Sequence, residues 1–105
     1  MKILFDQGVP APLRRAFADH IVSTAYEIGW AELANGELLK QASAEFDVLV
    51  TTDQSLRFQQ NLVGLHLAIV ILPTTDWSII RERQDVIVAR VEATRQGDVV
   101  ALSWS

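Results

Sequence analysis

Val48-Leu49-Val50-Thr51-Thr52-Asp53 is the stretch from which the fold of this 105-residue chain can be predicted. Three consecutive apolar β-forming residues are followed by two threonines and then by a carboxylate. A short, continuously apolar, valine-rich run is typical of a strand that is buried on both faces of a parallel sheet. Ligands of open α/β sheets bind beyond the carboxyl ends of such strands, so Asp53 occupies a position where a functional side chain is expected.

The beginning of the chain has the same form, because Lys2-Ile3-Leu4-Phe5-Asp6 is an apolar run that also ends in an aspartate. Further strands are expected at residues 21–25, 67–72 and 99–102, and the segments between them have helical character. Strands that alternate with helices predict a mainly parallel sheet with helices on both faces. We therefore predict one three-layer α/β domain over residues 1–105, with about five strands and a Rossmann-like winding.

The helical segments carry start and stop signals. Pro10 and Pro12 suit the start of a first helix, and Asn35 is a candidate N-cap for a second. The longest periodic segment begins near Trp77, and Gly97 is placed to end it as the C′ residue.

Composition excludes several classes of protein. The chain has no cysteine, which excludes a disulfide framework, a thiolate metal site and a cysteine nucleophile. Its one long apolar run, residues 67–72, is too short to span a bilayer, and no charged leader precedes an apolar region at the start. These features predict a cytoplasmic protein without membrane association. The net charge of −4 argues against binding nucleic acid through charge alone, but it leaves open a phosphate contact bridged by a metal ion.

Two acids are expected to meet at one edge of the sheet. If the strand order is 2-1-3-4, the strands that end at Asp6 and Asp53 are neighbours. Converging carboxylates repel one another unless a cation neutralises them, and oxygen ligands without His or Cys favour Mg²⁺ or Mn²⁺. Glu37 is a third candidate ligand, because it lies at a helix start that follows a strand's carboxyl end.

Each acid also has a purely structural interpretation. Asp6 could form an Asx turn before the prolines, Asp53 could cap the next helix, and Glu37 could stabilise the dipole of its own helix. Asp76 follows an apolar strand but precedes a strong helix, so capping is the favoured interpretation there. Glu32 lies in a polar loop and has no further positional argument.

Three segments together resemble the PIN-like superfamily: Lys2-Ile3-Leu4-Phe5-Asp6-Gln7, Asn35-Gly36-Glu37-Leu38-Leu39, and the stretch that ends at Asp53. More narrowly, they resemble the short PIN-like proteins that are predicted to be toxin nucleases of toxin–antitoxin pairs. The resemblance implies metal-dependent cleavage of RNA, with Asp6, Glu37 and Asp53 as metal ligands and Thr51 in support. The closer relatives carry another aspartate two residues after Asp53. Here that position is Ser55, for which Asp76 or Glu32 could substitute.

The leading hypothesis is therefore a Mg²⁺- or Mn²⁺-dependent ribonuclease that acts on single-stranded RNA and has an antitoxin protein as partner. The candidate contacts to the RNA backbone are Arg14, Arg15, Lys40 and Arg57.

The alternative is a catalytically degenerate PIN-like module that binds a protein or RNA without turnover. Trp30, Trp77 and Trp104 would serve such an interface, and their positions in or beside loops and the terminus predict a homodimer or a tight partner.

Overall fold

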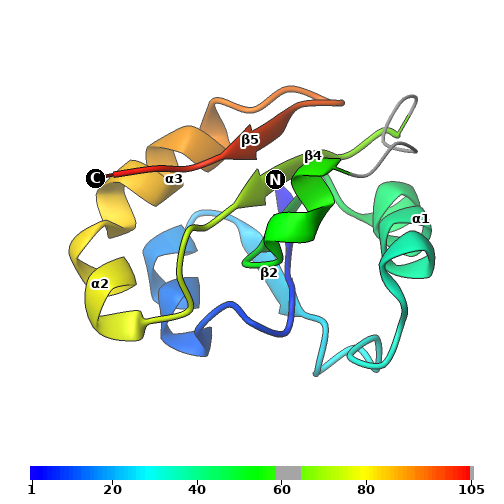
Figure 1. The fold of residues 1–105 in the computed structure, drawn as a ribbon, viewed down its shortest axis with the longest axis horizontal. Coiled ribbons are helices and arrows are strands. Elements are labelled where there is room, and N and C mark those ends of the chain that lie inside the picture. The colour runs from blue at the N-terminus through cyan, green and yellow to red at the C-terminus, as the bar shows by residue number, and fades with distance from the viewer. Residues whose placement is uncertain (59–64, 105) are drawn as a thin grey trace.

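A computed structural model describes residues 1–58 and 65–104 of the chain. Its five strands are all parallel and form one sheet in the order β2-β1-β3-β4-β5 (Figure 1). The strands are β1 (Lys2–Phe5), β2 (Ile21–Thr24), β3 (Val48–Thr51), β4 (Ala68–Ile71) and β5 (Val99–Ala101). The predicted parallel α/β sheet and the order of its first four strands are confirmed.

The three inner strands are apolar on both faces because helices cover both faces. In β1, Ile3 and Phe5 enter one core while Leu4 enters the other. In β3, Val48 and Val50 share the first core, and Leu49 belongs to the second. A strand covered on both sides has no position for a solvated side chain, which explains the continuous apolar runs in the sequence.

The helices form the two outer layers. On one face lie the 3₁₀ helix η1 (Ala11–Phe17) and the α-helices α2 (Trp77–Glu82) and α3 (Gln84–Glu92). On the other face lie α1 (Asn35–Glu45) and the 3₁₀ helix η2 (Gln54–Phe58), as Figure 1 shows for the α-helices. The buried helix residues are Leu13 and Phe17 of η1, Ile80 of α2, Ile87 and Val91 of α3, Leu38, Leu39 and Ala42 of α1, and Leu56 of η2.

Three expectations about helix ends are wrong. The N-cap of α1 is Ala34, and Asn35 is the first helical residue. The long periodic segment is two helices, which Arg83 separates with φ −115° and ψ 14°. Since α3 already ends at Glu92, Gly97 is not its C′ residue. Gly97 instead lies in the turn before β5, where it adopts φ 92°. Its N–H donates to the Leu67 carbonyl at 3.2 Å.

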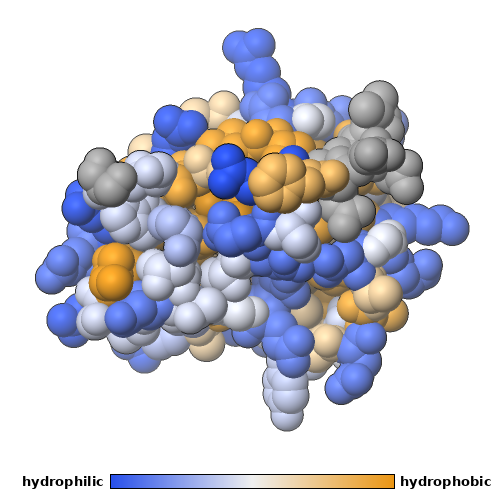
Figure 2. Space-filling view, in the orientation of Figure 1, coloured by the Kyte–Doolittle hydropathy of each residue, from blue (hydrophilic) through white to orange (hydrophobic). Residues whose placement is uncertain are grey.

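All three tryptophans are half-buried and pack within the fold. Trp30 meets Phe46 edge to face at 5.8 Å between ring centroids, while Trp77 and Trp104 pack against the core that faces η1, α2 and α3. Among the residues that the structure describes, the most exposed large apolar side chains are those of Ile21, Tyr26 and Phe58. Figure 2 shows apolar surface gathered over β4 and β5 on the viewed face, bordered by polar side chains.

None of the helices in the described part of the chain is long and apolar enough to span a membrane.

Candidate functional site

The register of the sheet brings the two predicted acids to one edge. Phe5 of β1 pairs with Val50 of β3, and the Asp6 N–H donates to the Val50 carbonyl at 2.9 Å. Asp6 therefore follows β1 directly beside Thr51, the last residue of β3, and Asp53 lies two residues beyond Thr51. The prediction that neighbouring parallel strands deliver these two acids is confirmed.

A single hydroxyl group connects the two acids. Thr51 is fully buried, and its Oγ1 donates a hydrogen bond to Asp6 Oδ2 at 2.8 Å. The same oxygen accepts the backbone N–H of Asp53 at 3.1 Å. A buried hydroxyl needs such partners, because leaving a polar atom without them in a core is costly. Thr51 thus holds the Asp6 carboxylate and the backbone of Asp53 at fixed positions relative to β3.

The turn after β1 packs closely on the end of β3. The Asp6 carbonyl accepts the Val9 N–H at 3.0 Å, and Asp6 Oδ1 accepts the Gln7 N–H at 2.8 Å. A Cβ atom added at Gly8 would lie only 2.1 Å from Thr52 Oγ1. Glycine therefore allows this turn to approach β3 and to hold the Asp6 backbone there.

Asp53 is held by donors from two further elements. The N–H and Oγ of Ser55, in η2, donate to Asp53 Oδ1 at 2.9 and 2.6 Å. From the first turn of α1, Asn35 Nδ2 donates to Asp53 Oδ2 at 2.9 Å. The Ser55 hydroxyl and then the Asn35 amide hold the pKa of Asp53 below its usual value, against the opposing effect of partial burial. Asp53 is therefore an anion at neutral pH, and it also caps η2, as its structural interpretation predicts.

Asn35 is the member of this site that sequence reasoning missed. Its side chain does not cap α1, since Ala34 occupies the N-cap position, and its amide donates to Asp53. The only signal in the sequence was a polar side chain at the start of a helix. A polar residue at a helix start is usually interpreted as a cap. Only the position of the end of β3 shows that the Asn35 side chain reaches Asp53 instead.

The predicted set of three metal ligands is not assembled. Glu37 is exposed on α1, and its Oε1 accepts a hydrogen bond from Gln41 Nε2 at 3.1 Å. Within residues 1–58 and 65–104, no group of three or more His, Cys, Asp or Glu side chains is arranged to hold a metal ion. The pair of Asp6 and Asp53 thus stands without a third acid among those residues.

The chemistry of the pair fits one small divalent cation. Each carboxylate offers about four acceptor positions. The hydrogen bonds described above leave some of these positions open on both Asp6 and Asp53. Mg²⁺ is commonly bound through one or two carboxylates and keeps several water molecules. Two carboxylates have the donor chemistry for one such hydrated ion, and they are too few for a two-ion centre.

In the part of the chain that the structure describes, the acids named as substitutes for a missing ligand do not form a metal-binding group with the pair. Asp76 is the N-cap of α2, and its Oδ1 accepts the N–H and Oγ of Ser78 at 2.9 and 2.7 Å. The capping interpretation of Asp76 is therefore confirmed. Glu32 is exposed in the loop before α1.

The four basic candidates differ in how they are used. Arg14 donates to the Val22 carbonyl at 2.8 Å and pairs with Glu27, so it connects η1 to β2 and to the loop that follows. Arg15, Lys40 and Arg57 are exposed. The Arg57 guanidinium lies 5.4 Å from the centroid of the Phe58 ring, in the element that follows Asp53. Arg57 is therefore the basic candidate closest in sequence to the site.

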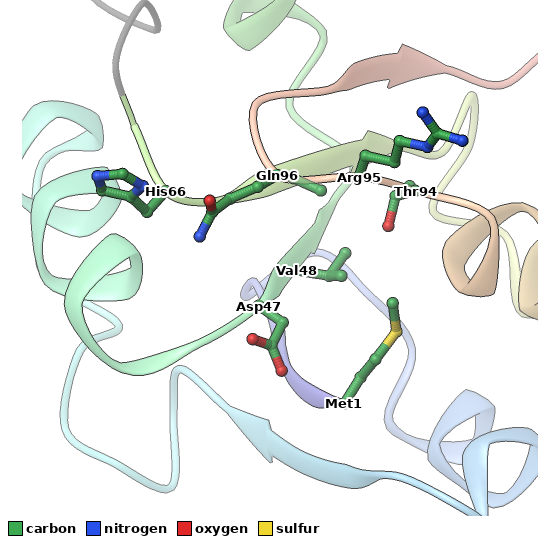
Figure 3. A pocket seen from close by; sticks show the side chains of 8 residues that line it. Met1, Asp47, Val48, His66, Thr94, Arg95 and Gln96 are labelled. Carbon is green, nitrogen blue, oxygen red and sulfur yellow. The ribbon is translucent and has the colours of Figure 1, made fainter.

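A cavity of about 320 Å³ lies at the opposite edge of the sheet (Figure 3). Met1, Asp47 and His66 line it, and these residues precede β1, β3 and β4, respectively. Thr94, Arg95 and Gln96 close it from the turn after α3. Since all strands are parallel, this cavity faces away from the edge that carries Asp6 and Asp53, and it is not part of their site.

No protein family, curated protein or solved structure matches this chain.

Proposed function

We propose that this protein is a PIN-like ribonuclease in which Asp6 and Asp53 together bind one Mg²⁺ or Mn²⁺ ion. The observation that carries the proposal is the buried Thr51 hydroxyl, which joins the two acids at the carboxyl ends of adjacent parallel strands. This is the edge at which ligands of open α/β sheets bind.

The proposed activity follows from the charges at this edge. A cation bound there would lower the pKa of a coordinated water and stabilise charge on the scissile phosphate. Without neutralisation, Asp6 and Asp53 would repel an RNA phosphate, and a chain with a net charge of −4 offers little general attraction for RNA. Phosphate binding at this edge is therefore expected to depend on the cation, with exposed Arg15, Lys40 and Arg57 as contacts to the rest of the backbone.

Substrate and partners follow from the resemblance to PIN-like toxins. We expect single-stranded RNA as the substrate, a cytoplasmic setting, and an antitoxin protein that covers the site. A homodimer is also expected. The exposed Ile21 and Tyr26, at and just beyond edge strand β2, offer apolar surface for such a contact.

Cleavage of a labelled single-stranded RNA in the presence of Mn²⁺ tests the proposal. Asp6→Asn and Asp53→Asn should each lower the rate roughly 10²-fold or more, because each removes a charge that would hold the cation. Asp76→Asn is the matched control, since Asp76 also follows a strand but caps α2. Cleavage that survives in the Asp6→Asn protein, or that is lost equally in the control, would contradict the assignment.

A second candidate function is binding of RNA or a protein without turnover. It is favoured by Glu37, which is exposed and bonded to Gln41, and by Ser55, which donates to Asp53 at a position where the short PIN-like proteins that the sequence resembles carry an acid. RNA that is retained in the presence of Mn²⁺ but never cleaved, with retention lost in Asp6→Asn, would favour this candidate over the nuclease.

A further inference from the structure

β2 is one of the two edge strands of the sheet, and an edge strand normally presents unpaired backbone groups to other chains. On its inner side, the Ile21 N–H donates to the Met1 carbonyl at 3.0 Å, and the Ala25 N–H, just beyond β2, donates to the last residue of β1. Because backbone groups alternate in direction along a strand, the outward-facing groups of β2 belong to Val22 and Thr24.

The outward-facing groups are one N–H and one carbonyl from each of these two residues, and three of the four are already bonded. The Val22 carbonyl accepts a hydrogen bond from Arg14 of η1 at 2.8 Å. The Thr24 N–H donates to Glu27 Oε1 at 2.8 Å, and the Thr24 carbonyl accepts the Ile28 N–H at 3.2 Å. Arg14 also forms an ion pair with Glu27, so the side chains that cover the two ends of the strand are joined to each other.

We propose that Arg14 and Glu27 block β2 against strand addition by a second copy of this chain. A strand that adds to a sheet edge must form main-chain hydrogen bonds with the outward-facing groups of that edge. At β2 the two side chains occupy the Val22 carbonyl and the Thr24 N–H, so an added strand has to displace them first. The proposal goes beyond the proposed nuclease and does not depend on its cation site.

A second copy is the strand that fits this edge, because β2 can pair with itself. Two antiparallel β2 strands centred on Ser23 place Val22 opposite Thr24 of the other copy, where such residues exchange two N–H···O bonds. Ile21 and Tyr26, which flank the outward-facing groups, are 64% and 81% exposed, so pairing would also cover apolar surface. While the block is in place, the homodimer expected at Ile21 and Tyr26 forms through side chains and not through strand pairing.

The charge of Glu27 keeps the block in place at neutral pH. The hydrogen bond from Arg14, and then that from the Thr24 N–H, hold the pKa of Glu27 below its usual value. The Glu27 N–H in turn donates to Thr24 Oγ1 at 3.2 Å. This reciprocal pair of bonds fixes the turn that carries the carboxylate, as in a capping box.

Amide hydrogen exchange and sedimentation velocity of the whole chain test the proposal. In Glu27→Ala the Thr24 N–H loses its acceptor and should exchange about tenfold faster than in wild type. In the Arg14→Ala/Glu27→Ala variant the Val22 carbonyl is freed as well, and we expect association above the wild-type level that increases with concentration. Adding Val22→Pro should abolish that association, because proline removes an outward-facing N–H and is tolerated at such a position of an edge strand.

Glu92→Ala is the matched control. Glu92 pairs with His20 at 2.7 Å, directly before β2, but its partner is a side chain rather than a backbone group of the strand. It should leave both measurements unchanged. A folded Arg14→Ala/Glu27→Ala variant that associates no more than wild type, or that still associates with Val22→Pro, would overturn the proposal. If that variant does not fold, Glu27→Ala alone decides, since an unchanged exchange rate at Thr24 would also overturn the proposal.

Discussion

At the scale of single residues, Thr51 is the polar exception in an otherwise apolar strand. Its neighbours Val48, Leu49 and Val50 are fully or almost fully buried, as Thr51 is, yet only Thr51 carries a group that must be hydrogen-bonded. The hydroxyl satisfies that need through Asp6 and the backbone of Asp53. One buried side chain therefore couples the end of β1 to the loop after β3.

Thr51→Val tests this coupling, because valine has nearly the same shape and lacks the hydroxyl. We expect a loss of about 1–3 kcal/mol in the free energy of unfolding, since the Asp53 N–H loses its partner and the Asp6 carboxylate loses a donor. Urea denaturation followed by tryptophan fluorescence measures the change. Thr51→Ser keeps the hydroxyl and should lose less. Equal stability of wild type and Thr51→Val would show that the hydroxyl contributes nothing to the fold.

Gly8 is a second residue at which a small change has a defined effect. Gly8→Ala would place a Cβ atom 2.1 Å from Thr52 Oγ1, so the threonine side chain or the turn must move. We expect a destabilisation of about 1–3 kcal/mol, as is typical of overpacking. Thr52→Ala removes the obstructing oxygen. In the double variant, the added cost of Gly8→Ala should largely disappear, which a double-mutant cycle measures. Additive effects would contradict this contact.

The sequence predicts site residues where a local pattern identifies them. Asp6 and Asp53 each terminate an apolar run, and position relative to a strand end requires no knowledge of the rest of the chain. The bond from Asn35 to Asp53 joins residues 18 positions apart and depends on where α1 begins relative to β3. Local propensity assigns such an asparagine to capping. For Glu37, the predicted position near the start of a helix is correct, but the predicted contact is not. Its side chain is bonded to Gln41 rather than grouped with the other acids.

At the scale of elements, strands were easier to predict than helix ends. The inner strands must be apolar on both faces, and that requirement leaves continuous runs in the sequence. The break between α2 and α3 has no comparable signal in the sequence, because the residue at the break, Arg83, is neither glycine nor proline. Ile80, Ile87 and Val91 keep their places in one core across the break, so the apolar period persists where the helix does not. The spacing of apolar residues indicates which face of a segment is buried, but it does not indicate whether the helix is continuous.

The start of α2 depends on Asp76, and its contribution should vary with pH. The Ser78 hydroxyl and then the Ser78 N–H hold the pKa of Asp76 below its usual value of 3.8. A carboxyl group with a lowered pKa in the folded state stabilises the fold above its unfolded pKa. That stabilisation is lost as the pH falls through the folded pKa.

Asp76→Ala should therefore lower the melting temperature at pH 7, and the difference from wild type should shrink when the pH is taken below 3.8. Melting curves at pH 7 and in acid, recorded by circular dichroism, measure both effects. Ser78→Ala should show a smaller difference with the same dependence on pH, because the Ser78 N–H remains. A difference that grows in acid would show that Asp76 does not act as a charged cap.

At the scale of the whole molecule, the proposed cation should stabilise the native state. Asp6 and Asp53 are brought to one edge of the sheet only when β1 and β3 pair, so the unfolded chain offers no such site. A ligand that binds only the folded protein adds about 2.7 kcal/mol at a hundredfold excess over its dissociation constant. For a domain of this size, that corresponds to a rise in melting temperature on the order of ten degrees.

Melting curves with EDTA and with Mn²⁺ measure this effect, and Asp53→Asn should remove the increase. Asp76→Asn should retain it, because Asp76 lies outside the pair. A melting temperature that is indifferent to Mg²⁺ and Mn²⁺ would contradict the cation site, whatever the activity of the protein.

The order β2-β1-β3-β4-β5 also has a consequence for a chain that is still leaving the ribosome. β1 emerges first and can pair with β2, after which β3, β4 and β5 each add to the growing side in the order of their synthesis. No strand has to insert between two that are already paired. Until β5 arrives, however, the bare margin of the nascent sheet is β3 or β4, whose residues are all buried in the finished fold. Such a margin is the kind of edge that recruits strands from other chains. β5 covers β4 and, being only three residues long, leaves a short edge strand in its place.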